Sequence, residues 1–188
     1  MTAGGALPRA AELVEEMRGA VAGRPPTGTP ALGGLVAGLT AVNLRQWDLE
    51  DTTRDPEASD AAIAGAKRAI DEHNLARHRL VQEIDAAIEA LVDPPATATL
   101  ATESPGMVVD RLSVLVIRRD RTVAASSRDA AYAVRLPALD AQLGALVTAL
   151  DGYLDELRAG ARRFSAHEPL KLYLGPGSRT RGGGTRPG

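Results

Sequence analysis

The chain has 188 residues, the length of one ordinary domain, and a chain of this size can bury enough surface to fold without a covalent or metal staple. It contains no cysteine, which excludes disulfides, thiolate metal sites and a cysteine nucleophile, and which fits a reducing compartment. Its net charge of -2, from 22 basic and 24 acidic residues, argues against a nucleic-acid partner. We therefore expect a cytoplasmic protein.

The composition also favours helices and argues against a membrane span. With one tryptophan, three tyrosines and one phenylalanine, the core must be built from aliphatic residues and alanine, whereas strands favour β-branched and aromatic residues. The first twenty residues carry Glu12, Glu15 and Glu16 where an export signal would need an apolar run. The longest apolar run, Leu112 to Ile117, is far shorter than the ~20 residues that cross a bilayer.

The first third of the chain predicts two helices separated by a loop. Apolar residues at four-residue spacing predict a helix over residues 8–22. Residues 24–30, with three prolines and a glycine, predict a loop. A second helix then extends to Arg54, where Asp55-Pro56 ends it, because the residue before a proline is disfavoured in a helix.

The middle of the chain predicts the longest helix. Ser59 is a good N-cap, and apolar residues recur at steps of three and four up to Val92. Two prolines after Asp93 end this helix. Residues 96–102 predict a connector; the sequence also allows a strand there, but a single short strand would have no partner.

The last third predicts two more helices. Ser104 followed by Pro105 is a strong helix start, and the apolar residues that follow surround nearly the whole helix, as in a helix at the centre of a bundle. The sequence leaves open whether this helix breaks near Ser126. A final helix is predicted from Pro137 to about Phe164, with leucines along one face.

Together these elements predict an all-α fold. We expect an antiparallel bundle of four to five long helices within a single domain over residues 1–174. The segment 175–188 is rich in glycine and arginine and is expected to be a disordered tail.

Two of the predicted apolar stripes turn polar at matching heights on the second and third helices. Because a short turn joins these helices, they should run antiparallel, and their polar residues should meet in the interior. The predicted cluster consists of Asn43, Trp47, Glu50, Arg54, Lys67, Asp71, Asn74 and Arg77. Asp110 and Arg111 interrupt the apolar fourth helix and are candidates for the same cluster, since charges inside a buried helix usually reach a partner on another helix.

Polar groups on a core stripe form either a paired network or the wall of a ligand site, because an unpaired buried polar group is costly. A third alternative is that these residues are a solvated face. One hypothesis is a pocket for a small anionic or polyhydroxylated metabolite, with Glu50 or Asp71 as acid or base and the other cluster residues as ligand-binding groups. The sequence leaves open whether any reaction is catalysed.

The alternative is a non-catalytic interaction or accessory protein in which the cluster is structural. Its pairs would be Glu50 with Lys67, and Asp71 with Arg54 or Arg77, and they would fix the register of the helices. Such a protein could form a homodimer or accompany a partner enzyme.

No cofactor or metal is predicted. The histidines lack a metal-binding spacing, and no glycine-rich phosphate loop follows a strand. A magnesium site of the kind that all-α nucleotide pyrophosphohydrolases use would need Glu50, Asp51, Asp71 and Asp110 to converge. The cations interleaved with these carboxylates favour anion binding instead.

Three blocks of residues carry a resemblance to a known family. They are Asn43-Leu44-Arg45-Gln46-Trp47-Asp48-Leu49-Glu50-Asp51 with Arg54; Lys67-Arg68-Ala69-Ile70-Asp71 with Asn74, Arg77 and Ile84-Asp85; and Pro105-Gly106 with Asp110-Arg111-Leu112-Ser113-Val114-Leu115. In these blocks the chain resembles a bacterial family known only as domain of unknown function 4254, and Lys171-Leu172-Tyr173 resembles its closing motif. The resemblance implies a helical domain and a shared site at the predicted cluster, but no established reaction.

The chain departs from this family pattern in two places. Family members typically continue the fourth-helix motif with lysine, tyrosine and histidine, where this chain has Arg118-Arg119-Asp120-Arg121, so only the first cation is matched. Leu174 replaces the asparagine that usually follows the closing tyrosine. If these positions belong to a site, the ligand or activity of this chain could differ from that of its relatives.

Overall fold

The computed structural model describes residues 6–27 and 30–166, which form five α-helices and almost no strand. The helices are α1 (Ala10–Val21), α2 (Pro30–Arg54), α3 (Asp60–Glu89), α4 (Pro105–Ser126) and α5 (Leu136–Arg158), with a 3-10 helix, η1 (Ala130–Arg135), directly before α5. The predicted all-α fold is thus confirmed. The predicted tail 175–188 and the segment 171–174 lie outside the described residues.

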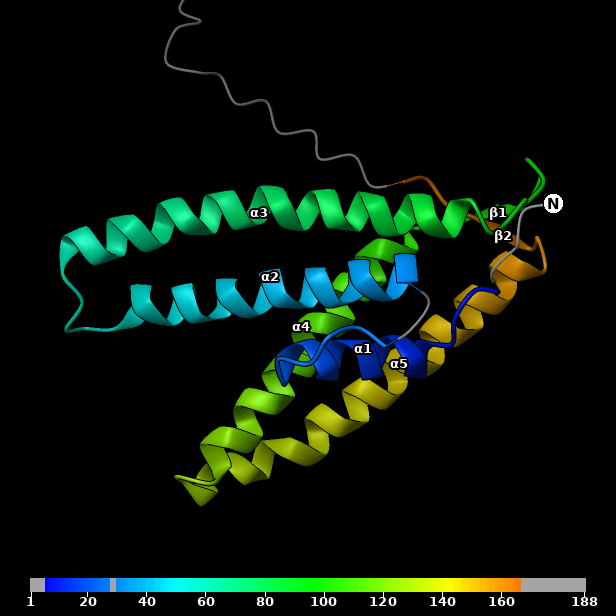
Figure 1. The fold of residues 1–188 in the computed structure, drawn as a ribbon. Helices are drawn as coiled ribbons and strands as arrows, with labels where there is room; N and C mark the ends of the chain where they lie inside the picture. Colours follow the sequence, from blue (N-terminus) through cyan, green and yellow to red (C-terminus); the bar gives the residue numbers. More distant parts are fainter. Residues whose placement is uncertain (1–5, 28–29, 167–188) are drawn as a thin grey trace, which may run out of the picture.

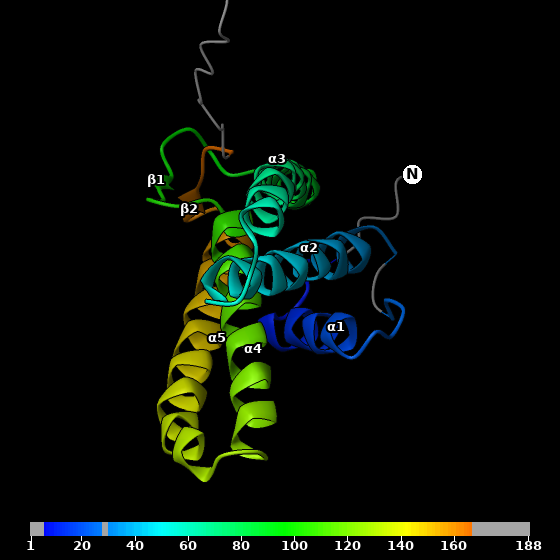
Figure 2. The ribbon, with the colours of Figure 1, turned by 90° about the vertical axis from the view of Figure 1, so that its left-hand side faces the viewer.

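The four long helices form two antiparallel hairpins. α2 and α3 lie side by side in one hairpin, and α4 and α5 form the other (Figure 1). The second hairpin crosses the first steeply, so that α4 and α5 run downwards in the view in which α3 is seen nearly end-on and α2 obliquely (Figure 2). α4 contacts α1, α2, α3 and α5, which confirms the central position predicted from its apolar circumference.

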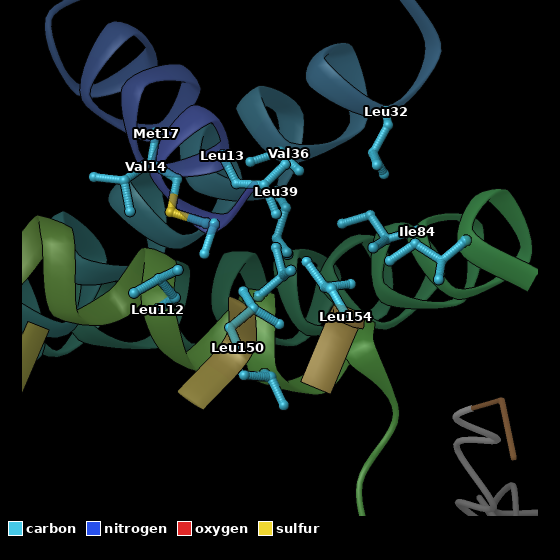
Figure 3. Packing of buried hydrophobic residues seen from close by; sticks show 14 of the residues in the cluster. Leu13, Val14, Met17, Leu32, Val36, Leu39, Ile84, Leu112, Leu150 and Leu154 are labelled. Carbon is cyan, nitrogen blue, oxygen red and sulfur yellow. The ribbon is translucent and has the colours of Figure 1, made fainter. Parts of the chain in front are cut away.

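The hydrophobic core lies where the two hairpins and α1 meet. Figure 3 shows Leu39 of α2, Ile84 of α3, Leu112 of α4 and Leu154 of α5 converging there, and none of these four side chains is exposed. Full burial of one such side chain contributes roughly 1.5–3 kcal/mol. The outer ends of both hairpins contain no fully buried residue over residues 44–65 and 118–138, so packing is strongest near the crossing.

Two serine caps begin helices where the sequence predicts them. The hydroxyl of Ser59 accepts a hydrogen bond of 3.3 Å from the backbone N–H of Ala62, and that of Ser104 accepts one of 3.4 Å from Met107. α4 continues without a break to Ser126, which answers the question that the sequence left open.

The predicted end of the last helix is wrong, and so is the expectation that a strand in the connector at residues 96–102 would have no partner. α5 ends at Arg158 and not near residue 164, because Gly160 takes a left-handed backbone conformation with φ of 67°. The released segment forms a two-residue strand, β2 (Arg162–Arg163), which pairs in parallel with β1 (Thr99–Leu100) in the connector. The connector therefore has a strand partner, which lies too far along the chain to be seen in the local pattern.

One helical segment, Ala130–Arg158, is long and apolar enough to cross a membrane by length and composition alone. The sequence predicts no stretch of that kind, because charged residues interrupt every continuous apolar run. In the structure, five leucines of α5 face the protein interior, and they are Leu139, Leu143, Leu150, Leu154 and Leu157.

Candidate functional site

The carboxylate of Asp110 in α4 is held by two neighbouring helices. Arg77 of α3 donates to it from Nε at 2.8 Å and from Nη2 at 2.5 Å, and the amide nitrogen of Asn43 in α2 donates at 2.9 Å. The same nitrogen also donates to the Ser113 hydroxyl at 2.6 Å. The hydrogen bond to Asp110 raises the pKa of the Arg77 guanidinium above its ordinary value, against the opposing effect of burial. The predicted meeting of Asn43, Arg77 and Asp110 is thus present.

A polar cavity of about 300 Å³ lies beside this network, between α2, α3 and α4. Its size is at the lower end of the range of small-molecule sites, roughly 300–1,000 Å³. The lining residues are Asn43, Gln46, Trp47, Glu50, Arg54, Arg77, Val114 and Arg118. Five of the ten predicted site residues line it, namely Asn43, Trp47, Glu50, Arg54 and Arg77.

Two amide oxygens at this cavity have no hydrogen-bond partner in the described part of the chain. They are Oδ1 of Asn43 and Oε1 of Gln46, and both atoms are buried. The orientation of the Asn43 amide is fixed, because its nitrogen must face the Asp110 carboxylate, which only accepts. The Gln46 nitrogen donates to Oδ1 of Asn74 at 3.0 Å. Each of these two residues lines the cavity and has an unused acceptor, which a ligand hydroxyl or amine can reach only if the wall shifts slightly.

The cations around the cavity are not all neutralised. Arg54 pairs with Glu50 at 3.1 Å, and Arg77 pairs with Asp110. Arg118, which α4 places in the cavity wall, has no carboxylate partner among residues 6–27 and 30–166. The wall together with the Asp110 carboxylate behind Arg77 therefore carries one more positive than negative charge, which favours an anionic group in the cavity.

Lys67 and Asp71 do not reach this cavity. Both side chains are exposed on α3, and neither belongs to the lining residues. The predicted pairs of Glu50 with Lys67 and of Asp71 with an arginine are wrong. Both residues lie one step to the side of the α3 stripe that faces α2, and Arg54 lies one turn from Glu50 on the same helix.

Arg111 is also separate from the polar cavity. Its exposed side chain pairs with Glu103 of the connector at 2.9 Å, whereas its neighbour Asp110 faces inward. Adjacent positions on a helix point about 100° apart, so the two charges reach different surroundings.

Arg111 lines a second hollow, an open groove of about 660 Å³ between α4 and α5. Its walls consist of Arg77, Arg111, Val114, Leu115, Arg118, Gln142, Ala145, Leu146 and Ala149. Arg77, Val114 and Arg118 also line the polar cavity, so the two hollows adjoin. The groove combines three arginines with an aliphatic floor.

Sequence reasoning missed Gln46 and Arg118 as site residues. Gln46 lies one residue beside the predicted stripe, but it comes almost one turn after Asn43 and so shares its face. The sequence identifies Arg118 only as the first cation after the fourth-helix motif. Helical spacing places Arg118 one turn after Val114, on the side of α4 that lines both hollows, and this spacing could have identified it.

A second buried carboxylate, Asp85 of α3, has a structural place. Its side chain is fully buried, and its Oδ1 accepts a hydrogen bond of 2.7 Å from the backbone N–H of Gly106, in the first turn of α4. A negative charge at a helix N-terminus is favourable against the helix dipole. Ile84-Asp85 and Pro105-Gly106 belong to the blocks that resemble the family, and this contact gives both a structural role. Neither pair lines the cavity.

In the described ranges, no three acidic or histidine side chains form a group that could hold a metal ion. The four carboxylates of the magnesium alternative, Glu50, Asp51, Asp71 and Asp110, therefore do not converge in such a group. Asp110 faces Arg77, and Glu50 faces Arg54.

The fold and the site define an all-α protein with a polar cavity between its central helices. The chain belongs to the family described as a protein of unknown function, DUF4254, whose model matches residues 34–166. The matched range contains every residue that lines the cavity and the groove. No curated protein and no solved structure shows a significant match to the chain.

Proposed function

We propose that the polar cavity binds a small anionic metabolite that carries hydroxyl groups. The observation that supports this most directly is the pair of unpartnered amide oxygens, on Asn43 and Gln46, in a wall that also holds Arg118. Buried acceptors without a partner are costly, and a ligand hydroxyl that shifts the cavity wall slightly would satisfy them. The uncompensated guanidinium of Arg118 would bind a phosphate or carboxylate through paired hydrogen bonds.

Acid or base chemistry in this cavity would fall to Glu50. Among the residues that the structure describes, Glu50 supplies the only carboxylate in the cavity lining. Its side chain is 40% exposed, so a bound molecule can reach it. Its partner Arg54 would orient the carboxylate towards the ligand. Asp71, which is exposed outside the cavity, has no part in the proposal.

A second candidate is the accessory protein with a structural cluster. The observation in its favour is that Asn43, Arg77 and Asp110 form a connected network across α2, α3 and α4. Such a network fixes the register of three helices without any ligand. The two candidates differ in the outer half of the cluster, at Gln46, Glu50 and Arg118, which the network does not use.

Thermal unfolding with a panel of glucose 6-phosphate, AMP and citrate tests the proposal. A ligand present at a hundred times its dissociation constant adds about 2.7 kcal/mol to the free energy of unfolding. We expect at least one probe to raise the melting temperature, and Arg118→Gln to abolish that rise. Arg79→Gln is the matched control, because Arg79 is exposed on α3 and lines neither hollow.

Two outcomes would contradict the proposal. One is a melting temperature that none of the three probes changes, which would favour the accessory protein. The other is an equal loss of the ligand effect in Arg118→Gln and Arg79→Gln, which would mean that the anions bind to surface charge in general.

A further inference from the structure

The groove between α4 and α5 points to the chemical class of the ligand. We infer that the metabolite is an anionic amphiphile: its charged group lies between Arg77 and Arg118, its polar part fills the cavity, and a single apolar chain lies along the groove. This inference rests on the proposed function, because it too assigns the anionic group to Arg118, and it adds Arg77 beside it. It adds a second, apolar half to the binding site.

The chemistry of the groove wall supports an apolar chain. Val114 and Leu115 of α4 face Leu146 of α5 across it, and Ala145 and Ala149 leave room between them. Leu115 and Leu146 are only partly buried, so the groove exposes aliphatic surface that a chain could cover. Each methylene that leaves water for such a surface strengthens binding about three- to fourfold.

The charges at the groove support an anionic group at one end of that chain. Arg77, Arg111 and Arg118 line it, and no carboxylate belongs to its walls in the part of the chain that the structure describes. Arg77 and Arg111 are each paired with a carboxylate outside the groove wall, whereas Arg118 has no such partner among residues 6–27 and 30–166. A neutral amphiphile would cover the aliphatic floor but leave the guanidinium of Arg118 without a counter charge.

The shared wall supports a single ligand across both hollows. Arg77, Val114 and Arg118 belong to the cavity on one side and to the groove on the other. Asn43 and Gln46 line the cavity only, and Leu115 and Leu146 line the groove only. The order along the site is therefore polar group, anion and apolar chain.

Calorimetric titration with three probes tests this order in the full-length protein. The probes are methyl phosphate, octyl phosphate below the concentration at which it forms micelles, and octyl glucoside, which is neutral. We expect octyl phosphate to bind at least a hundredfold more tightly than methyl phosphate, and at least tenfold more tightly than octyl glucoside.

A pair of variants on α5 separates the groove from general hydrophobicity. Ala145→Trp fills the groove from an exposed position and should weaken octyl phosphate at least tenfold, with no effect on methyl phosphate. Thr148→Trp is the control, because Thr148 is exposed on the same helix but lines neither hollow. Circular dichroism and the melting temperature verify that both variants are folded.

The outcomes distinguish this inference from the proposed function. Equal affinities for methyl and octyl phosphate, or equal effects of Ala145→Trp and Thr148→Trp, overturn the apolar half. In that case methyl phosphate binding that Arg118→Gln removes still supports the polar site. If the protein binds neither methyl phosphate nor octyl phosphate, both proposals are overturned.

Discussion

Asp85 and Gly106 join α3 to the first turn of α4 through a hydrogen bond of 2.7 Å between a buried carboxylate and a backbone N–H. The contact is so close that a β-carbon on Gly106 would lie 2.5 Å from the carbonyl oxygen of Val81 and 2.7 Å from Oδ1 of Asp85. Real β-carbons do not approach other atoms so closely, and the Val81 oxygen belongs to a helix backbone that cannot move alone. The absence of a side chain at Gly106 therefore fixes how closely the two hairpins approach.

Gly106→Ala should accordingly destabilise the protein by about 2 kcal/mol or more, because the two helices must separate to admit one methyl group. Urea unfolding measures this. Gly144→Ala is the matched control: Gly144 lies inside α5 with nothing within 4 Å of its would-be β-carbon, so alanine should stabilise by about 0.5–1 kcal/mol. A Gly106→Ala protein as stable as the wild type would show that the helices are not packed as closely as described.

Most of the fold could be predicted from local sequence signals. The errors of that prediction lie where segments distant in the sequence meet. The caps at Ser59 and Ser104 and the proline breaks lie within a few residues of the helix ends that they determine. The pairing of residues 99–100 with 162–163 depends on the position of α5 in the tertiary structure, which no local pattern contains. The same is true of the crossing of the two hairpins.

The network around Asp110 should contribute strongly to stability. Asp110→Asn removes the negative charge that Arg77 faces and leaves a partly buried guanidinium without its partner, so we expect a loss of about 2–3 kcal/mol. Arg77→Met should cost a similar amount by itself. The double variant should lose less than the sum of the two, because neither charge is then left unpaired. Strictly additive losses in urea unfolding would mean that the two side chains do not interact.

The candidate site could be predicted in part, because helical spacing places Asn43, Glu50 and Arg77 towards the neighbouring helices. Helical spacing alone does not predict which neighbouring helix each side chain contacts. Arg77 pairs with Asp110 of α4, whereas the sequence indicates Asp71 as a partner of Arg77 and gives Asp110 only as a candidate for the same cluster. The set of α3 residues predicted to face the interior is also too large, because it includes Lys67 and Asp71, which are exposed.

Glu50 and Asp71, both sequence candidates for an acid or base, should behave differently on substitution. Neither Glu50→Gln nor Asp71→Asn should change the free energy of unfolding by more than about 1 kcal/mol, because the Glu50 pair is substantially exposed and Asp71 is exposed. Glu50→Gln should alter the melting-temperature rise given by whichever of glucose 6-phosphate, AMP or citrate stabilises the wild type. Asp71→Asn should leave that rise unchanged, and an effect of Asp71→Asn as large as that of Glu50→Gln would place the ligand elsewhere.

Tyr153 should make stability depend on pH in the alkaline range. Its hydroxyl donates to the backbone oxygen of Glu103 at 2.8 Å, and burial together with the charge of Asp85 raises the pKa of the phenol above its ordinary value. The folded state thus holds the phenolic proton more tightly than the unfolded state, in which the pKa is about 10. The stabilisation is fully present below that pH and is lost as pH rises above it.

Tyr153→Phe removes both the hydrogen bond and the titration, so the wild type should be more stable by about 1 kcal/mol near pH 8. That advantage should shrink steadily as the pH rises from about 9 to about 11.5, since only the wild type must retain a proton there. Urea unfolding of both proteins across this range measures the difference. Tyr132→Phe is the control, because the exposed Tyr132 hydroxyl makes no hydrogen bond within the described residues. A difference between wild type and Tyr153→Phe that stays constant with pH would show that the phenol is as well solvated in the folded chain as in the unfolded one.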